Sequence, residues 1–238
     1  PANPGIIRSI VTSTMVDKIC AKQGVKLDEC LTGFKWIANV MAGYEKTGSN
    51  NYIFGFEESY GYNVETDVRD KDGVSAAAMC AEMTLYWRSV GKSLLERLEE
   101  LYAEYGYYQD VAIAKNFPGS SGVDTMKGIM ANLRKDGLKT LGGKKVVKIR
   151  DVGQQIIYDP ANPDAKEKLD LPSSNVLQFF LEGGTVVSAR PSGTEPKIKF
   201  YVNATVSVEN GLDAAKKEAN ELCAAIEKEI NAILDAAN

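Results

Sequence analysis

The sequence of 238 residues contains no histidine, and this absence excludes several kinds of active site. A Ser-His-Asp or Cys-His nucleophile system requires an imidazole base, so neither can be built within this chain. The four cysteines form no Cys-x-x-Cys pair, and without histidine the usual zinc-binding spacings cannot be built either. We therefore expect reduced thiols in the protein core at Cys20, Cys30, Cys80 and Cys223.

The chain also lacks a signal peptide and any apolar run of about 18 residues, the length that a membrane-spanning helix needs. A hydrophobic share of 44% and a charged share of 25% are those of an ordinary soluble globular protein. A net charge of −4 argues against nucleic acid or a membrane as a partner, because both require a basic face. These features favour a cytoplasmic enzyme or a fragment of one.

The first half of the chain alternates between strand-like and helix-like patterns, which is typical of an α/β layer. The expected strands are Ile6–Ser13, Val25–Leu31 and Tyr52–Phe56, and the expected helices are Thr14–Gln23, Phe34–Glu45, Val74–Val90 and Ser93–Tyr105. The leucines of the last helix, Leu94, Leu95, Leu98 and Leu101, are expected to form its buried stripe. We predict an α/β mixed-sheet domain over residues 1–106.

The second half shows several strand-like segments and two helix-like segments, with one helix near each end of this half. The expected strands are Tyr108–Lys115, Lys145–Asp151, Val176–Glu182, Thr185–Arg190 and Ile198–Val206, with helices from Ser120 or Ser121 to about Lys135 and from about Val208 to Ala237. This pattern predicts a smaller α+β domain over residues 107–238, with a mostly antiparallel sheet and flanking helices. Its proline-containing segment 159–164 is expected to be a surface loop.

The segment 190–199 is rich in groups that bind anions. Arg190 offers a planar fork of donors, Ser192 and Thr194 offer hydroxyls, and Gly193 allows a backbone N–H to approach an oxyanion without a Cβ. Lys199 adds a second cation on the other side of the hydroxyls. The segment is interpreted either as a phosphate-binding loop or as an ordinary β-hairpin loop, because the same residue types are common in turns.

The residues Glu57, Glu58 and Ser59 directly follow an expected strand, so that a carboxylate and a hydroxyl can point into a cleft at the end of the strand. Carboxylates accept paired hydrogen bonds from vicinal sugar hydroxyls. An acidic turn in which Ser59 caps a helix is the alternative. Glycoside hydrolysis does not fit, since its two carboxyls must lie on opposite sides of a sugar, roughly 5 to 9 Å apart.

The polar segment 66–73 superficially resembles a calcium loop, but its spacing fails. If Gly73 is the invariant glycine, the first ligand position falls on Val68 and the last on Met79. We instead expect Asp72 to cap the next helix and Lys71 to project beside the cleft, although a solvated lysine is also compatible with the sequence.

Four segments, in this order, resemble motifs of the α-D-phosphohexomutases, a family that includes the bacterial phosphoglucomutase/phosphomannomutase enzymes. They are Thr32-Gly33-Phe34-Lys35, Gly55-Phe56-Glu57-Glu58-Ser59, Arg69-Asp70-Lys71-Asp72-Gly73 and Arg190-Pro191-Ser192-Gly193-Thr194. The resemblance spans essentially the whole chain. It implies the C-terminal half of such an enzyme, comprising an N-terminally trimmed third domain and a fourth domain, without the serine loop and the aspartate-rich Mg²⁺ loop.

The resemblance also implies roles for individual residues. Glu57 and Ser59 would bind the sugar hydroxyls with Thr32 nearby, and Lys71 would act at the reacting phosphoryl group. The phosphate that is not transferred would be held by Arg190, Ser192, Gly193, Thr194 and Lys199. Mg²⁺ and glucose 1,6-bisphosphate would serve the intact enzyme, and no residue of this chain would bind the metal.

The implied reaction interconverts hexose 1-phosphate and hexose 6-phosphate through a phosphoserine and a bisphosphorylated sugar. Tyr60-Gly61 stands where some branches have Gly-His, which excludes a histidine acid or base and places more weight on Lys71. This version of the loop resembles the branch that also contains phosphopentomutases. Glucose is the first candidate sugar, with mannose and pentose phosphates open, and a stand-alone sugar phosphate binding module without catalysis is the alternative function.

Overall fold

The computed structural model describes residues 2–119, 121–193 and 195–237 of the chain. The chain divides into two compact units, Pro1–Gly106 and Tyr107–Asn238. An α/β unit is followed by an α+β unit, and the predicted fold class is confirmed. The second unit is the larger one, not the smaller as expected, and its sheet contains three strands that the sequence pattern did not indicate.

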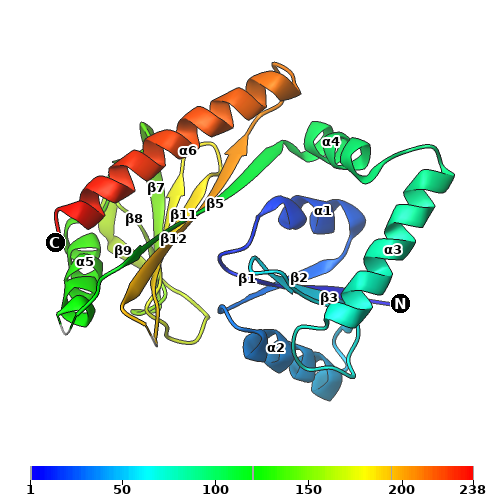
Figure 1. The fold of residues 1–238 in the computed structure, drawn as a ribbon. Helices are drawn as coiled ribbons and strands as arrows, with labels where there is room; N and C mark the ends of the chain where they lie inside the picture. The colour runs from blue at the N-terminus through cyan, green and yellow to red at the C-terminus, as the bar shows by residue number, and fades with distance from the viewer. Residues whose placement is uncertain (1, 120, 194, 238) are drawn as a thin grey trace. The chain divides into compact units, whose positions relative to one another are not determined.

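The first unit, whose strands β1, β2 and β3 are labelled in Figure 1, is built on a four-stranded sheet with the order β2-β1-β3-β4. Its strands are β1 Pro4–Ser9, β2 Lys26–Cys30, β3 Asn51–Glu57 and β4 Gly61–Asn63. β1 pairs in parallel with both β2 and β3, whereas β4 folds back against β3 as an antiparallel hairpin. The parallel strands therefore end at one edge of the sheet, which is where ligands bind in open α/β sheets.

Four helices accompany this sheet, namely α1 Met15–Gln23, α2 Phe34–Thr47, α3 Gly73–Ser89 and α4 Leu94–Tyr105. Gly24 and Gly48 end the first two helices in the left-handed conformation, each with a φ of 65°. Asp72 and Ser93 cap the last two through their side chains, as their positions in the sequence predict. Local sequence signals thus define most of the helix ends of this unit.

The core of the first unit lies between the sheet and α2. Its buried residues are Ile7, Cys30, Phe34, Ile37, Met41 and Tyr44. The leucine stripe expected on α4 is not buried, since Leu95 is 74% exposed and the other three leucines are only half-buried. The reason is that α4 packs mainly against α1 and α3, so that no sheet covers this stripe.

The helix α3 carries no buried residue, although most of its side chains are apolar. Cys80 lies on this helix and is exposed, so the expectation of a core position is wrong for this cysteine, while the other three cysteines are buried free thiols. None of the described helices is long and apolar enough to cross a membrane.

The second unit is an eight-stranded sheet in which every described pair is antiparallel. The strand order is β5-β12-β11-β10-β7-β8-β9, and β6 pairs with β7 beside this path. The strands are β5 Tyr107–Asn116, β6 Thr140–Leu141, β7 Lys144–Asp151, β8 Ile156–Asp159, β9 Asn162–Lys168, β10 Leu177–Leu181, β11 Val186–Pro191 and β12 Lys197–Val206.

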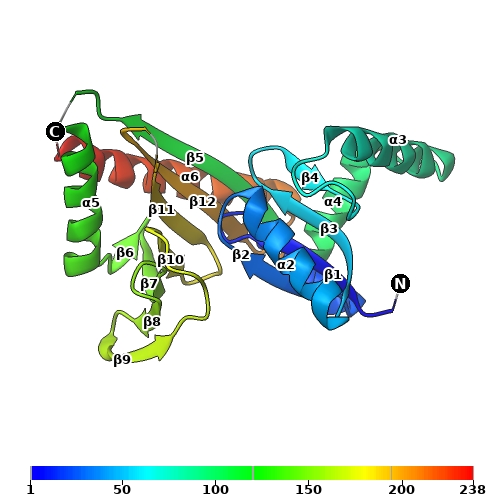
Figure 2. The same cartoon turned by 90° about the horizontal axis from the view of Figure 1, so that it is seen from below.

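The segment 159–164 is not a surface loop. It forms the turn of the β8–β9 hairpin and the first half of β9, which lies at the edge of the sheet (Figure 2). All seven residues of β9 are exposed, so this strand shows none of the apolar alternation that would predict it. Pro163 is tolerated there because a proline on an edge strand removes no hydrogen bond between strands.

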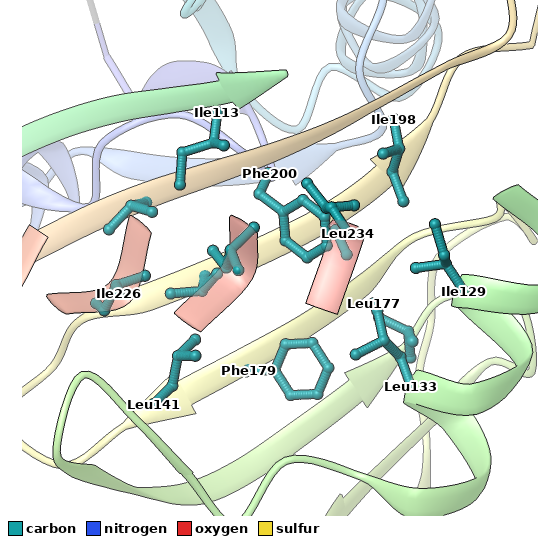
Figure 3. Packing of buried hydrophobic residues seen from close by; sticks show 14 of the residues in the cluster. Ile113, Ile129, Leu133, Leu141, Leu177, Phe179, Ile198, Phe200, Ile226 and Leu234 are labelled. Carbon is teal, nitrogen blue, oxygen red and sulfur yellow. The ribbon is translucent and has the colours of Figure 1, made fainter. Parts of the chain in front are cut away.

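The larger buried cluster of the second unit lies between the sheet and the helices α5 Gly122–Asp136 and α6 Leu212–Asp235 (Figure 3). Phe179 and Phe200 contribute from the sheet, Leu133 from α5, and Ile226 and Leu234 from α6. α6 packs along β12 and β5, and its buried positions recur at the three- and four-residue spacing of an amphipathic helix. These contacts support β11 and β12.

Candidate functional site

Glu57 is the last residue of β3 and lies at the edge of the sheet where the parallel strands end. Its side chain is 4% exposed, and a buried carboxylate needs hydrogen-bonding or ionic partners. The backbone N–H of Gly33 donates to Oε1 of Glu57 at 2.5 Å, and Nζ of Lys71 lies 3.6 Å from Oε2. Two of the segments singled out in the sequence therefore meet at this carboxylate.

Thr32 precedes Gly33 in the turn before α2 and thus lies beside the same carboxylate. Its hydroxyl oxygen is buried and has no hydrogen-bond partner among the described residues. A buried hydroxyl without a partner is uncommon and calls for an explanation, such as a ligand or a water. This observation agrees with the expected role of Thr32 in ligand binding, which stays a prediction.

Lys71 is half-exposed and is held by several neighbours rather than freely solvated. Its Nζ lies 3.4 Å from Oδ1 of Asp70 and 5.1 Å from the centre of the Phe34 ring. A Cβ on Gly61 would lie 3.1 Å from both the Lys71 stem and the Phe34 ring, so glycine at this position permits their close approach. The ammonium group is thereby directed toward Glu57, while part of its side chain remains accessible to solvent.

Asn63 organises the segment that carries Lys71, a role that was not foreseen from the sequence. Its side-chain amide is fully buried and donates to the carbonyl oxygens of Val68 at 2.9 Å and Asp70 at 3.1 Å. On the far side of Lys71, Oδ1 of Asp72 accepts the N–H groups that begin α3. The Ser75 hydroxyl and these N–H groups lower the pKa of Asp72. The lysine is therefore fixed from both directions along the chain.

Ser59 lies in the exposed turn between β3 and β4, and it caps no helix among the described residues. Its hydroxyl donates to Oε1 of Glu58 at 3.2 Å, and Oε2 of Glu58 accepts a hydrogen bond from the hydroxyl of Ser9, also at 3.2 Å. Ser9 is the last residue of β1, the parallel neighbour of β3. Glu58 was singled out in the sequence only as a neighbour of Glu57 and Ser59, and its contact with Ser9 was not foreseen because it depends on strand pairing.

In the second unit, Arg190 lies near the end of β11 and is half-buried. Lys199 on β12 is its cross-strand partner in the antiparallel ladder, which brings the two cations to one end of the hairpin. The backbone N–H of Ser192 donates to the carbonyl of Lys197 at 2.7 Å, and the Ser192 hydroxyl accepts the N–H of Glu195 at 3.3 Å. The segment is thus a β-hairpin loop, and this geometry is compatible with a phosphate site.

Gly193 is exposed, and a Cβ at this position would meet no atom within 4 Å. Its backbone φ is also outside the left-handed region, so the chain itself does not require glycine here. The expected close approach of a ligand would explain this glycine, but nothing in the structure tests it. Thr194 lies outside the described residues.

The described side chains therefore form two separate groups. Thr32, Glu57 and Lys71 lie together in the first unit, with Ser59 in the adjoining turn, whereas Arg190, Ser192, Gly193 and Lys199 share one hairpin of the second unit. Among residues 2–119, 121–193 and 195–237, no cluster of three or more carboxylate or thiol side chains could hold a metal ion. The first group thus combines carboxylate, hydroxyl and cationic side chains, and the second combines hydroxyl and cationic side chains.

The comparisons with known proteins identify the family of both units. The family model for phosphoglucomutase/phosphomannomutase, alpha/beta/alpha domain III, matches residues 1–105, and the model for the phosphoglucomutase/phosphomannomutase C-terminal domain matches residues 113–228. The chain belongs to the phosphoglucomutase/phosphomannomutase family.

The chain is similar to named members of this family. It is 33% identical over 201 residues to a phosphoglucomutase of Staphylococcus saprophyticus, covering 84% of this chain and 36% of that protein. It is 37% identical over 230 residues to a human phosphopentomutase, covering 94% of this chain and 37% of that protein. The chain therefore spans a little over a third of the length of these relatives.

A solved structure shows the same fold. The open form of the Paramecium phosphoglucomutase parafusin superposes with a TM-score of 0.63 at 20% sequence identity. The match covers 98% of this chain and 37% of that protein. The mixed and antiparallel sheets described above are thus those of a phosphohexomutase.

Proposed function

We propose that this chain is the sugar- and phosphate-binding part of an enzyme that interconverts hexose 1-phosphate and hexose 6-phosphate. The observation that carries the proposal is that both units match consecutive domains of one mutase family over nearly the whole chain. Glucose is the first candidate sugar and mannose the second. A pentose phosphate is a further candidate, because a human phosphopentomutase is among the similar proteins.

In this proposal the first unit binds the sugar. Glu57 and Ser59 accept hydrogen bonds from sugar hydroxyls beside Thr32, and Lys71 neutralises charge on the reacting phosphoryl group or moves a proton there. Support comes from the buried hydroxyl of Thr32, which has no partner among the described residues, and from the 3.6 Å approach of Lys71 to Glu57. Glu57 retains acceptor capacity beyond these contacts, since an ionised carboxylate has about four lone-pair sites.

The second unit holds the phosphate that is not being transferred. Arg190 and Lys199 supply positive charge, Ser192 and Thr194 supply hydroxyls, and the backbone at Gly193 approaches the anion. A phosphate carries about −1.5 to −2 charges near neutral pH, so a charged loop can supply much of the binding energy. One loop of this kind serves either orientation of a sugar bisphosphate, and this is what a mutase cycle requires.

The chemical step itself belongs to the longer polypeptide in this proposal. A phosphoserine gives its phosphoryl group to one end of the sugar phosphate, and the other phosphate of the bisphosphate returns to the serine. Mg²⁺ and glucose 1,6-bisphosphate belong to that intact enzyme, which we place in the cytoplasm. The 238-residue chain alone is expected to bind phosphosugar weakly and to be inactive, because the length of its relatives leaves room for the N-terminal domains that complete them.

A stand-alone module that binds sugar phosphates without catalysis is the alternative. The encoded reading frame separates the two hypotheses. A serine loop and an aspartate-rich loop upstream of this chain would support the mutase, whereas their absence would support the module.

The proposal is tested by calorimetric titration of the chain with glucose 1,6-bisphosphate, beside the variant Arg190→Ala. We expect the affinity to fall about 10- to 100-fold, because the hydrogen bonds that are lost involve charged groups. The thermal transition should change little, since the side chain is only half-buried at the end of β11. Lys217→Ala is the matched control, because it removes one positive charge from an exposed position of α6 in the same unit. A large loss of stability with unchanged affinity would contradict the proposal.

A further inference from the structure

Glu58 has no role in the function proposed above, yet it links the buried end of β1 to the exposed turn that carries Ser59. Its Oε2 lies 3.2 Å from the Ser9 hydroxyl and its Oε1 lies 3.2 Å from the Ser59 hydroxyl. The Ser9 hydroxyl also lies 2.8 Å from that of Thr12. Ser9 and Thr12 are 0% and 5% exposed, so this network is anchored in the protein interior.

The directions of these hydrogen bonds follow from the chemistry of the groups. An ionised carboxylate only accepts hydrogen bonds, and a serine hydroxyl has one proton to donate. Ser9 donates its proton to Glu58, and Thr12 must therefore be the donor in its contact with Ser9. Ser59 likewise donates its proton to Glu58. The lone pairs of the Ser59 oxygen are then what this hydroxyl offers to a ligand.

We propose that Glu58 is a positioning residue that makes Ser59 an obligate hydrogen-bond acceptor toward the ligand. This inference rests on the proposed function, in which Ser59 contacts a sugar hydroxyl. It adds that the sugar hydroxyl is the donor in this contact. A ligand group that accepts hydrogen bonds but cannot donate them is rejected at this position.

The inference predicts a specific response to fluorine substitution, because a C–F group can accept a hydrogen bond only weakly and has no proton to donate. The probes are glucose 1-phosphate and its 2-, 3- and 4-deoxyfluoro analogues, titrated into the 238-residue chain by calorimetry. At the position that contacts Ser59, we expect fluorine to weaken binding about tenfold in the unaltered chain, which is the size of one lost hydrogen bond. Ser59→Ala should remove this discrimination and identify the position.

Two variants of Glu58 test whether this residue orients the Ser59 hydroxyl or only stabilises the local structure. Glu58→Leu removes the acceptor and frees the Ser59 proton, so the ratio of hydroxyl to fluoro affinity at that position should fall to about twofold or less. Glu58→Gln should preserve the ratio, because its amide oxygen can accept from Ser59 while its NH₂ group donates to Ser9 and Ser9 donates to Thr12.

The outcomes distinguish this inference from the function on which it rests. Equal weakening of all probes in Glu58→Leu, with an unchanged hydroxyl to fluoro ratio, would mean that Glu58 has only a structural role and would overturn the inference alone. Failure of the unaltered chain to bind glucose 1-phosphate at all would count against the proposed function and the inference together.

Discussion

The two units of the chain differ in how they bury their apolar residues. In the second unit a buried cluster joins the sheet to both α5 and α6, whereas the cluster of the first unit described above joins the sheet to α2. The helix α3 of the first unit contributes nothing to a core, and its exposed large apolar residues are Val74, Met79, Met83, Leu85 and Tyr86. The comparison teaches that apolar composition alone does not determine burial, because a helix is buried only when another element covers it.

The largest difference should appear when one large apolar side chain is truncated in each unit, buried in the second unit and exposed on α3 in the first. Phe179→Ala in the second unit should lower the free energy of unfolding by about 3–5 kcal/mol, because Phe179 is fully buried. Leu85→Ala on α3 should change it by less than about 0.5 kcal/mol. Urea titration followed by circular dichroism measures both effects.

The two tryptophans make this test specific, because Trp36 and Trp87 both lie in the first unit. Phe179→Ala should therefore shift the circular dichroism transition and leave the tryptophan fluorescence transition in place. If both signals shift together, the two units unfold in a single transition, and the stabilities of the units cannot be compared separately.

Arg8 is a charged residue of the first unit whose side chain is buried. It is 1% exposed and forms ion pairs with Asp17 at 2.8 Å and with Glu29 at 2.7 Å. Arg8→Leu should lower the free energy of unfolding of this unit by about 2 kcal/mol. The effect is smaller than for a fully buried pair, because both carboxylates reach solvent and can be hydrated after the change. Tryptophan fluorescence in urea measures this loss of unfolding free energy, with Arg88→Leu on the exposed α3 as the control. Equal losses in the two variants would show that the burial of Arg8 is not the cause.

The cap of α3 should have a smaller effect. Asp72→Ala removes the acceptor for two backbone N–H groups and should cost about 1 kcal/mol, whereas the exposed Asp67→Ala should cost little. Hydrogen bonds from Ser75 and Val74 lower the pKa of Asp72, so the ionised carboxylate stabilises the folded state. This contribution is present at neutral pH and is lost as the pH falls below about 4. The difference between the variant and the unaltered chain should therefore shrink at pH 3, and a difference that grows in acid would show that the cap is not the cause.

Cysteine labelling tests the difference between the exposed α3 and the buried parts of both units with the smallest expected effect on stability. Iodoacetamide should modify Cys80 in the native chain and leave the other three cysteines intact, since Cys80 is exposed on α3. Burial raises the pKa of Cys30 to about 12, and it also raises the pKa of Cys20 and Cys223, so their reactive thiolates are scarce. Mass spectrometry should find one modified cysteine per chain without denaturant and four with it. Native labelling of Cys30 would contradict its buried position.

Local signals account for the parts of the fold that were predicted correctly. Gly24, Asp72 and Ser93 act at helix ends through their own backbone or side chain, so their roles can be recognised from a few neighbouring residues. The β8–β9 hairpin was missed because β9 is exposed along its whole length and carries no apolar period. A strand of this kind is defined by its partner, and not by its own sequence.

The same distinction applies to the candidate site. Glu57, Lys71 and the segment at Thr32 were singled out separately, and the structure brings them together at one strand end. Ser9, Asn63 and the contact that Glu58 makes with Ser9 were not foreseen, because these contacts exist only after β1 and β3, or β3 and β4, have paired. The roles of the site residues as ligands stay predictions.

The edge strand β9 has a consequence for self-association. An unpaired strand edge is a template on which a second chain can add, and β9 presents Pro163, Asp164, Lys166, Glu167 and Lys168 along this edge. Proline withholds a hydrogen-bond donor, and adding a second copy of the strand would place charged side chains in a sheet that excludes water. Growth of the sheet into a fibril is therefore opposed by the residues of this strand, and replacing them with apolar residues would convert its end into an aggregation site.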